Sequence, residues 1–314
     1  MFKKILLSSS LIATSMLANQ NIVPLANING NTGNVVPSGI FKIGIINESC
    51  SKSTAYNGED EVSNNKHRKM KVNVTKFKAK YGLGNGLEIR GIISYKDKEF
   101  SATHPGTHKT YTNKNSGLGD SLIFAKYEIL NQKKGDGVFF SIGAGVKLPT
   151  GDTSKTFSTV PKPTGGDTFS LMQLGSGSTD YLGEIALTKI LKNSRIDTHI
   201  IYTQTTKGDN NYQFGDSLKW NLGYSHALTK KFDVQLELNG KECGKHKNNG
   251  NEVNSTGGSF TYLIPGIHYK ISKKYDFSAG YSYMIKRDNN FDSANSVGGL
   301  SEDNRVVFRL GIKL

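Results

Sequence analysis

Residues 138–148 read Val-Phe-Phe-Ser-Ile-Gly-Ala-Gly-Val-Lys-Leu and are followed by Pro149-Thr150-Gly151-Asp152. Apolar residues at the even positions alternate here with mostly small or polar residues. A period of two predicts a β-strand with one apolar and one polar face. Pro149 ends the strand, because proline cannot donate a hydrogen bond to a sheet. A Ser/Thr/Pro/Gly-rich stretch follows, and a second alternating run begins at Thr179. The segment predicts a hairpin with one very long loop.

The same alternation recurs along the rest of the chain and predicts about twelve strands. They span residues 40–46, 70–81, 87–96, 118–129, 138–148, 180–190, 195–206, 218–228, 232–241, 260–271, 275–286 and 305–314. Most are near ten residues, which is the length that a tilted strand needs to cross a bilayer.

The connections between these strands alternate in length without exception. Short turns span residues 82–86, 131–137, 191–194, 229–231 and 272–274, whereas long polar connections span 47–69, 97–117, 149–179, 207–217, 242–259 and 287–304. Outer-membrane barrels follow this rule, with short periplasmic turns and long external loops. The predicted fold is all-β: a transmembrane antiparallel up-and-down β-barrel, with both termini on the periplasmic side.

Aromatic residues gather at both ends of the predicted strands. Tyr81, Phe232 and Tyr275 lie beside short turns, and Tyr95, Tyr202, Phe214 and Tyr283 lie near long loops. Two aromatic girdles at the membrane interfaces would place them in this way. A secreted β-sandwich with aromatic residues at the ends of its core stays open as the rival fold.

The N-terminus has the pattern of a secretory signal peptide. Lys3 and Lys4 precede an apolar stretch from Ile5 to Leu17. Small residues follow, so we expect cleavage after Ala18 or as late as Ala26. The expected organisation is a signal peptide over residues 1–18, a short periplasmic leader over 27–39 and the barrel over 40–314. The expected location is the outer membrane.

Composition excludes several other classes of protein. The net charge is +14, but the basic residues are scattered and form no stripe, so nucleic acid is not an expected partner. Cys50 and Cys243 are the two cysteines, and whether they pair stays open. They have no companions at metal-ligand spacing, so we expect neither a metal nor a cofactor.

Four motifs together resemble a bacterial family named for a putative MetA pathway of phenol degradation. They are Tyr81-Gly82-Leu83, Gly117-Leu118-Gly119-Asp120, Lys147-Leu148-Pro149-Thr150-Gly151-Asp152 and Leu174-Gly175-Ser176-Gly177-Ser178. The resemblance covers roughly Ile40 to Leu314. It implies a transporter-like barrel in the outer membrane and the uptake of small aromatic or apolar compounds.

The predicted inner face of the barrel carries charges of both signs. The candidates for lining a pore are Arg90, Asp120, Lys126, Lys147, Asp180, Glu184, Arg195, Lys219, Asp233, Glu237 and Arg309. Two interpretations stay open: ion pairs that fill a small barrel, and a constriction of opposed charges that selects small polar solutes. The loop over residues 149–179 is either a plug in the lumen or a floppy external loop.

The sequence therefore predicts a channel for passive diffusion of small solutes and no enzyme. Expected partners are outer-membrane lipid and lipopolysaccharide, the barrel assembly machinery and a small-molecule permeant. One alternative is a closed barrel whose loops bind a ligand or a surface. The other is a membrane-embedded lipid-modifying enzyme. For such an enzyme, His226 is the one histidine expected on the outer face, and its neighbour Ser225 points to the lumen.

Overall fold

The computed structural model describes residues 22–157, 170–293 and 297–314. The predicted signal peptide over residues 1–18 lies outside this range. No helix in the described part of the chain is long and apolar enough to cross a membrane.

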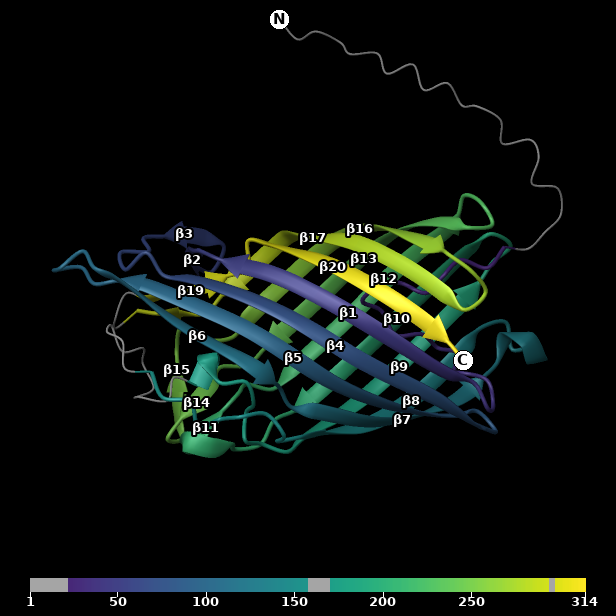
Figure 1. The fold of residues 1–314 in the computed structure, drawn as a ribbon, viewed down its shortest axis with the longest axis horizontal. Coiled ribbons are helices and arrows are strands. Elements are labelled where there is room, and N and C mark those ends of the chain that lie inside the picture. The colour runs from purple at the N-terminus through teal and green to yellow at the C-terminus, as the bar shows by residue number, and fades with distance from the viewer. Residues whose placement is uncertain (1–21, 158–169, 294–296) are drawn as a thin grey trace, which may run out of the picture.

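A single antiparallel sheet closes on itself to form the barrel (Figure 1). Its strands are β1 (Phe41–Lys52), β4 (Lys69–Gly84), β5 (Leu87–Thr103), β6 (Thr110–Leu118), β7 (Ser121–Leu130), β8 (Phe139–Leu148), β9 (Asp180–Ile190), β10 (Ser194–Gln204), β12 (Ser217–Ala227), β13 (Phe232–Cys243), β16 (Gly258–Lys270), β17 (Tyr275–Asn289) and β20 (Asn304–Lys313). β6 and β7 pair with successive parts of β5, so together they occupy one strand position in the barrel. β1 pairs with β20 and closes a barrel of twelve strand positions, which confirms the predicted fold.

The outer surface of the barrel is apolar and its interior is polar. In β20, Phe308 points outward and is 45% exposed, whereas the adjacent Val307 is fully buried. Ile123 and Leu222 are also exposed on the outside, at 59% and 49%. Conversely, Asp233, Glu237 and His268 have no exposed area. Such an inverted distribution is stable only where lipid covers the apolar band.

Some strands extend further toward the external end of the barrel than predicted. β1 continues from the predicted end at Ile46 to Lys52, and β5 continues from Lys96 to Thr103. Beyond the bilayer both faces of a strand meet water, so the apolar alternation disappears while the backbone pairing continues. Hydrophobic periodicity therefore marks the lipid-covered part of each strand and not its end.

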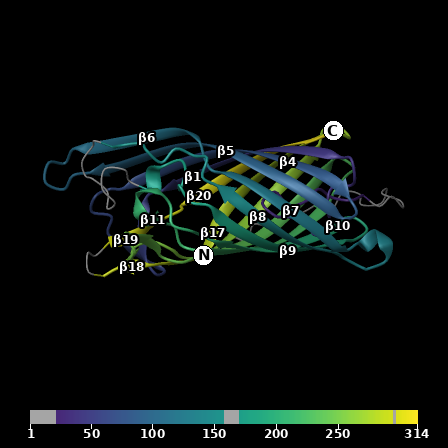
Figure 2. The same cartoon turned by 90° about the horizontal axis from the view of Figure 1, so that it is seen from below.

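Two small sheets cap the end that carries the long loops (Figures 1 and 2). One contains β11 (Tyr212–Gln213), β14 (His246–Asn248) and β15 (Asn251–Val253). The other contains β18 (Phe291–Asp292), β19 (Val297–Ser301), β2 (Thr54–Asn57) and β3 (Asp60–Val62). Three short 3-10 helices, η1 (Gln132–Lys134), η2 (Ser170–Met172) and η3 (Asp209–Asn211), lie in connections.

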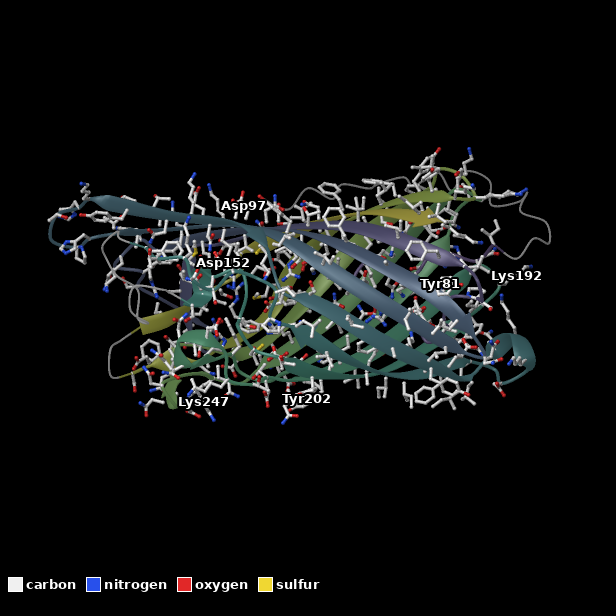
Figure 3. All side chains as sticks on the ribbon, turned by 60° about the horizontal axis from the view of Figure 1, so that its bottom comes forward. Tyr81, Asp97, Asp152, Lys192, Tyr202 and Lys247 are labelled. Atoms are coloured by element: carbon white, nitrogen blue, oxygen red, sulfur yellow. The ribbon has the colours of Figure 1, made fainter. Side chains whose placement is uncertain are left out.

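The two ends of the barrel differ as predicted. Figure 3 shows Tyr81 and Lys192 at the end with the short turns, and Asp97, Asp152 and Lys247 toward the other end. Tyr81, Tyr275, Tyr95, Tyr202 and Tyr283 are all exposed on the outer surface. Phe214 is an exception among the predicted girdle residues, because its ring packs against Tyr212 and His246 in the external loops.

Candidate pore and the segments that occupy it

Ten of the eleven predicted pore residues lie on strands with their side chains on the inner face. The register of neighbouring strands places them on one side of the sheet, for example Lys126 opposite Glu88 and Lys147 opposite Asp180. Asp120 lies between β6 and β7 and turns toward the barrel rim. The ten are Arg90, Lys126, Lys147, Asp180, Glu184, Arg195, Lys219, Asp233, Glu237 and Arg309.

Charges in the periplasmic half of the lumen pair with one another. Arg90 lies 3.5 Å from Glu184 and 3.8 Å from Glu88, and Lys126 lies 3.8 Å from Glu184. Nearby, Arg195 pairs with Asp197 at 2.6 Å, in contacts that are shielded from solvent. A buried charge is tolerated only when it is paired and hydrogen-bonded. This half of the barrel is therefore filled by side chains.

Residues 22–39, which we call the N-terminal segment, cross this filled half of the lumen. The sequence predicted a short periplasmic leader over 27–39, but the structure places these residues inside the barrel. Asn27 and Ile28 are 1% and 4% exposed, and Val36 is 5% exposed. The segment starts beside β13, where the Leu25 amide donates to Asp233 at 2.8 Å. It leaves at β4, where the Gly39 amide donates to the Gly82 carbonyl at 2.9 Å.

Inward carboxylates bind the backbone amides of the N-terminal segment. Glu237 accepts from the Ile28 amide at 2.8 Å, and Glu88 accepts from the Val36 amide at 2.9 Å. Asn31 donates its backbone amide to His199 Nδ1 at 3.0 Å. Outside any sheet, the amides of this buried segment need acceptors, and the barrel wall supplies them.

Cationic side chains bind the carbonyls and amide oxygens of the same segment. Lys126 donates to the Thr32 carbonyl. Arg309 donates to the Ala26 and Asn27 carbonyls at 3.3 and 3.2 Å. Six of the predicted pore residues thus contact the N-terminal segment directly; these are Lys126, Glu184, Arg195, Asp233, Glu237 and Arg309.

Glycines allow the N-terminal segment to press against the wall. A Cβ atom on Gly33 would lie 2.3 Å from the Phe139 carbonyl oxygen, and one on Gly223 would lie 1.7 Å from Asn27 Nδ2. Both approaches are closer than any side chain permits. The Asn- and Gly-rich composition of residues 27–34 was the sequence feature that could have revealed this role, because amides donate and accept while glycine leaves space.

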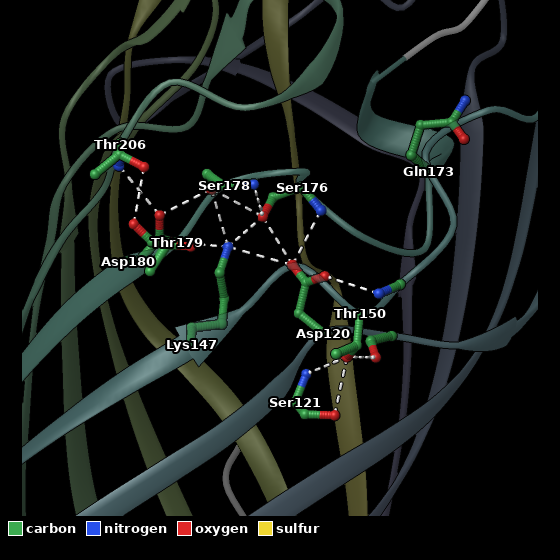
Figure 4. A network of polar contacts seen from close by, with 12 residues as sticks. Asp120, Ser121, Lys147, Thr150, Gln173, Ser176, Ser178, Thr179, Asp180 and Thr206 are labelled. Atoms are coloured by element: carbon green, nitrogen blue, oxygen red, sulfur yellow. Dashed lines mark hydrogen bonds and ion pairs between the residues drawn. The ribbon is translucent and has the colours of Figure 1, made fainter.

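A second polar cluster, the rim network, joins three loops at the external end (Figure 4). Lys147 Nζ lies 2.6 Å from Asp180 Oδ2 and 3.2 Å from Asp120 Oδ2. Ser176 donates its amide and its hydroxyl to Asp120, at 3.0 and 2.7 Å. Ser178 donates its hydroxyl to Asp180 at 2.8 Å. Lys147 and Asp180 are both predicted pore residues, and they are register partners on β8 and β9.

The four sequence motifs acquire a structural explanation from these contacts. Three of them, at 117–120, 147–152 and 174–178, meet in the rim network. Gly151 and Gly175 touch there, since a Cβ on Gly175 would lie 2.2 Å from the Gly151 carbonyl oxygen. The fourth motif, at 81–83, supports the N-terminal segment, because a Cβ on Gly82 would lie 2.1 Å from the Pro37 carbonyl oxygen.

The described parts of the loop over residues 149–179 fold onto the inner face of β5 and β6. Phe157 and Met172 pack against Phe100 and Ala102 in a buried cluster. Lys98 donates to the Leu171 and Gln173 carbonyls at 3.0 and 2.6 Å. The middle of this loop, residues 158–169, lies outside the described residues.

The cysteines and the possible metal ligands form no further site among the described residues. Both cysteines are free thiols, each half-buried on the inner face. No cluster of three His, Cys, Asp or Glu residues that could hold a metal ion occurs within the described ranges.

The closed sheet, its apolar exterior and its polar interior define an outer-membrane β-barrel. The family described as Putative MetA-pathway of phenol degradation matches residues 68–295. The chain belongs to this family, as the four motifs predicted.

Among solved structures, the chain is similar to an outer membrane channel from Pseudomonas putida F1, with a TM-score of 0.68 and 14% identity over 92% of this chain and all of that one. At this identity, the likeness shows the fold. Weaker matches include the transport unit of the Escherichia coli autotransporter AIDA-I, at a TM-score of 0.45 and 11% identity over 92% of each chain. The KdgM porin matches at a TM-score of 0.42 and 10% identity, over 86% of this chain and 98% of that one. None of the curated protein sequences matches the chain.

Proposed function

We propose that the protein is an outer-membrane channel for passive diffusion of small solutes, narrowed at its periplasmic end by the N-terminal segment. The observation that carries the proposal is the inner face itself. Lys219 and Lys241 point into the barrel and yet are exposed to solvent. The external half of the lumen is therefore accessible to water, and a water-accessible interior is the requirement for solute passage.

The N-terminal segment is well suited to act as an adjustable constriction. It is held by hydrogen bonds from individual side chains and by one isolated bridge between Ser38 and Gly82, without strand pairing. Such contacts can exchange with water singly, whereas a strand must break its ladder cooperatively. Pore lining by the eleven predicted residues is part of this proposal.

The family name and the resemblance of the motifs support small aromatic compounds as permeants. The solved relative with the same fold is a channel, and the KdgM match is named a porin. Lipopolysaccharide at the outer leaflet and insertion by the barrel assembly machinery belong to the same proposal, because both accompany proteins of this architecture.

The lipid-modifying alternative has one structural feature in its favour. Ser194 Oγ lies 2.8 Å from His226 Nδ1, beside the short turn over residues 191–194. Ser225, the neighbour of His226, instead donates to Asn27 inside the barrel at 2.9 Å. A serine–histidine pair needs an orienting acid, and no carboxylate contacts His226 within the described ranges. The pair therefore lacks the third member of a catalytic triad among the described residues.

Current through planar bilayers tests the proposal. The full-length protein is expected to give discrete steps of ion current, and the double variant Glu184→Gln/Glu237→Gln is expected to give larger steps. Both substitutions weaken hydrogen-bond acceptors that hold the N-terminal segment, because Glu184 accepts from Asn31 Nδ2 at 2.9 Å and Glu237 accepts from the Ile28 amide at 2.8 Å. Glu99→Gln, on the outer face of β5 beyond the membrane, is the matched control. Absence of current from all three proteins would overturn the channel.

A further inference from the structure

Lysine side chains converge on the external half of the lumen, which we call the outer vestibule. Lys219 on β12 and Lys241 on β13 are register partners, so their side chains lie next to each other on the inner face. Lys76 on β4 lies across the barrel, six strands away in the order of the sheet. The complete set is Lys52, Lys76, Lys96, Lys98, Lys219 and Lys241.

These ammonium groups repel one another across the lumen. Lys219 interacts electrostatically with Lys241 beside it and with Lys76 opposite. Lys52 interacts with Lys241, and Lys98 interacts with Lys96 and Lys52. Lys96 also interacts with Lys76, so the six lysines are linked in a closed loop of repelling charges, which we call the lysine ring. Its members lie on two facing sides of the wall, on β1, β4 and β5 and on β12 and β13.

Acidic residues do not balance this ring. Glu48 pairs with Lys76 at 2.6 Å, and Glu302 pairs with Arg305, which lies outside the ring, at 2.8 Å. Lys96 and Lys98 donate to neutral backbone carbonyls. Within the described ranges, Lys52, Lys219 and Lys241 have no carboxylate within 4.0 Å. The rim network adds Lys147 with Asp120 and Asp180, but these two acids already bind Lys147 and the loop amides.

The contrast with the periplasmic half is sharp. There, Glu88, Glu184 and Glu237 are 1%, 4% and 0% exposed and are bound by cations or by the N-terminal segment. Lys219 and Lys241 are exposed on the same inner face and form no ion pair with any residue that the structure describes. Unpaired cations in a water-filled space with low-dielectric walls attract anions strongly, because the walls focus the field.

We propose that the outer vestibule is an anion-selective entrance that concentrates small anions, including aromatic carboxylates, ahead of the constriction. This inference rests on the proposed channel function for transport, but the preference for anions at the entrance stands independently of any current. It also narrows the permeant class, since a ring of cations assists neither a small cation nor an uncharged apolar compound.

The native cysteines permit a direct test in the full-length protein. Cys243 lies two residues beyond Lys241 on the inner face and interacts electrostatically with Lys219. In a Cys50→Ser background, its thiolate would attack the sulfenyl sulfur of a methanethiosulfonate reagent, form a mixed disulfide and expel methanesulfinate. The measured quantity is the ratio of the rates with the anionic sulfonatoethyl and the cationic trimethylammonioethyl reagents. Because both reagents attack the same thiol, the ratio of their rates does not depend on the reactivity of that thiol.

We expect this ratio to exceed that of the unfolded chain by about tenfold or more. It should fall toward the unfolded value in Lys219→Gln/Lys241→Gln. The matched control is Lys71→Gln/Lys114→Gln, which removes two lysines that pair with Glu99 on the outer side of the same rim, at 3.7 and 2.8 Å. A ratio equal to that of the unfolded chain, or one unchanged by the vestibule variant, would overturn the inference. Failure of Cys243 to react with either reagent would do the same.

Reversal potentials in a salt gradient separate this inference from the channel proposal. A conducting, anion-selective wild type whose selectivity falls in Lys219→Gln/Lys241→Gln supports both. A conducting but cation-selective protein overturns the anion entrance and leaves the channel. Charge-dependent labelling of Cys243 without any current overturns the channel and leaves the anion-binding vestibule.

Discussion

The side-chain amide of Asn31 donates to Glu184 Oε2 at 2.9 Å, in the middle of the barrel. Asn31 belongs to the N-terminal segment and Glu184 to β9, so the contact joins residues 153 positions apart in the chain. Glu184 also pairs with Arg90 and Lys126. One carboxylate thus connects the wall charges to the segment that narrows the lumen, and the segment's position should respond to changes in that wall.

Gly33→Ala should move the N-terminal segment away from the wall. The new Cβ would meet the Phe139 carbonyl oxygen at 2.3 Å and the Thr188 amide nitrogen at 2.6 Å. Relief of that overlap breaks the hydrogen bond from the Gly33 amide to Thr188 Oγ1, 2.8 Å long, and the expected cost is about 1–3 kcal/mol of stability. Larger current steps in planar bilayers and faster proteolysis near residue 33 are the expected readouts.

Gly91→Ala is the control for this substitution, because nothing lies within 4 Å of its Cβ position. Unchanged current steps in Gly33→Ala, with normal folding judged by heat-modifiable gel mobility, would show that the N-terminal segment does not limit conduction.

Asp120→Asn should release the loop over residues 149–179 from the rim. Asp120 accepts from the Gly151 amide at 3.1 Å and from the Ser176 amide at 3.0 Å, and it pairs with Lys147. Loss of its charge weakens all three contacts, each charge-assisted bond being worth about 1.5–3 kcal/mol. We expect cleavage of this loop by added protease to accelerate about tenfold or more. Asp97→Asn, on the outer face beyond the membrane, should leave the rate unchanged. Equal rates in both variants would contradict a tethering role.

The small external sheet of β11, β14 and β15 should loosen in acid. His246 Nδ1 contacts the Tyr212 hydroxyl at 2.7 Å, and burial, with help from Lys241 and Lys52, lowers the pKa of His246 to about 4. Because the folded pKa is below the usual value of 6.5, the neutral histidine stabilises this sheet above pH 6.5. That contribution is lost as the pH falls from 6.5 through about 4.

Hydrogen exchange resolved along the chain measures this effect. Amides of residues 212–213 and 246–253 should open about tenfold more readily at pH 4.5 than at pH 6.5, after correction for intrinsic exchange. His246→Phe, which cannot titrate, should abolish the pH dependence. A wild type whose corrected protection is flat over this range would disprove the role of His246.

The mature chain should begin at Asn19. Ile22 and Leu25 precede the later candidate cleavage position at Ala26, and both bind the barrel. The Leu25 amide donates to Asp233 at 2.8 Å, and the Ile22 amide donates to Asn193 at 3.3 Å. Cleavage after Ala18 preserves these bonds, and intact mass spectrometry of protein from outer membranes decides the point. A mature chain that starts at Asn27 would show that the contacts are dispensable.

The amino-acid pattern by itself determined the barrel wall. In β9, the prediction of residues 180–190 coincides with Asp180–Ile190, because lipid on one side and polar filling on the other impose a strict period of two. The same rule placed Lys147, Glu184, Glu237 and Arg309 on the inner face. The lengths of the turns gave the orientation, since short turns and long loops lie at opposite ends.

Only the tertiary structure decided what occupies the lumen that this wall encloses. Residues 27–39 have no periodicity, so the rule that placed the strands does not distinguish a segment in solvent from one whose amides bind Glu237 and Glu88. The lysine ring cannot be predicted from a local pattern for a related reason. Lys76 and Lys219 are 143 positions apart and face each other only once the sheet has closed. Closure of the sheet brings together side chains that no local pattern connects, and the chemistry of the lumen depends on the contacts between them.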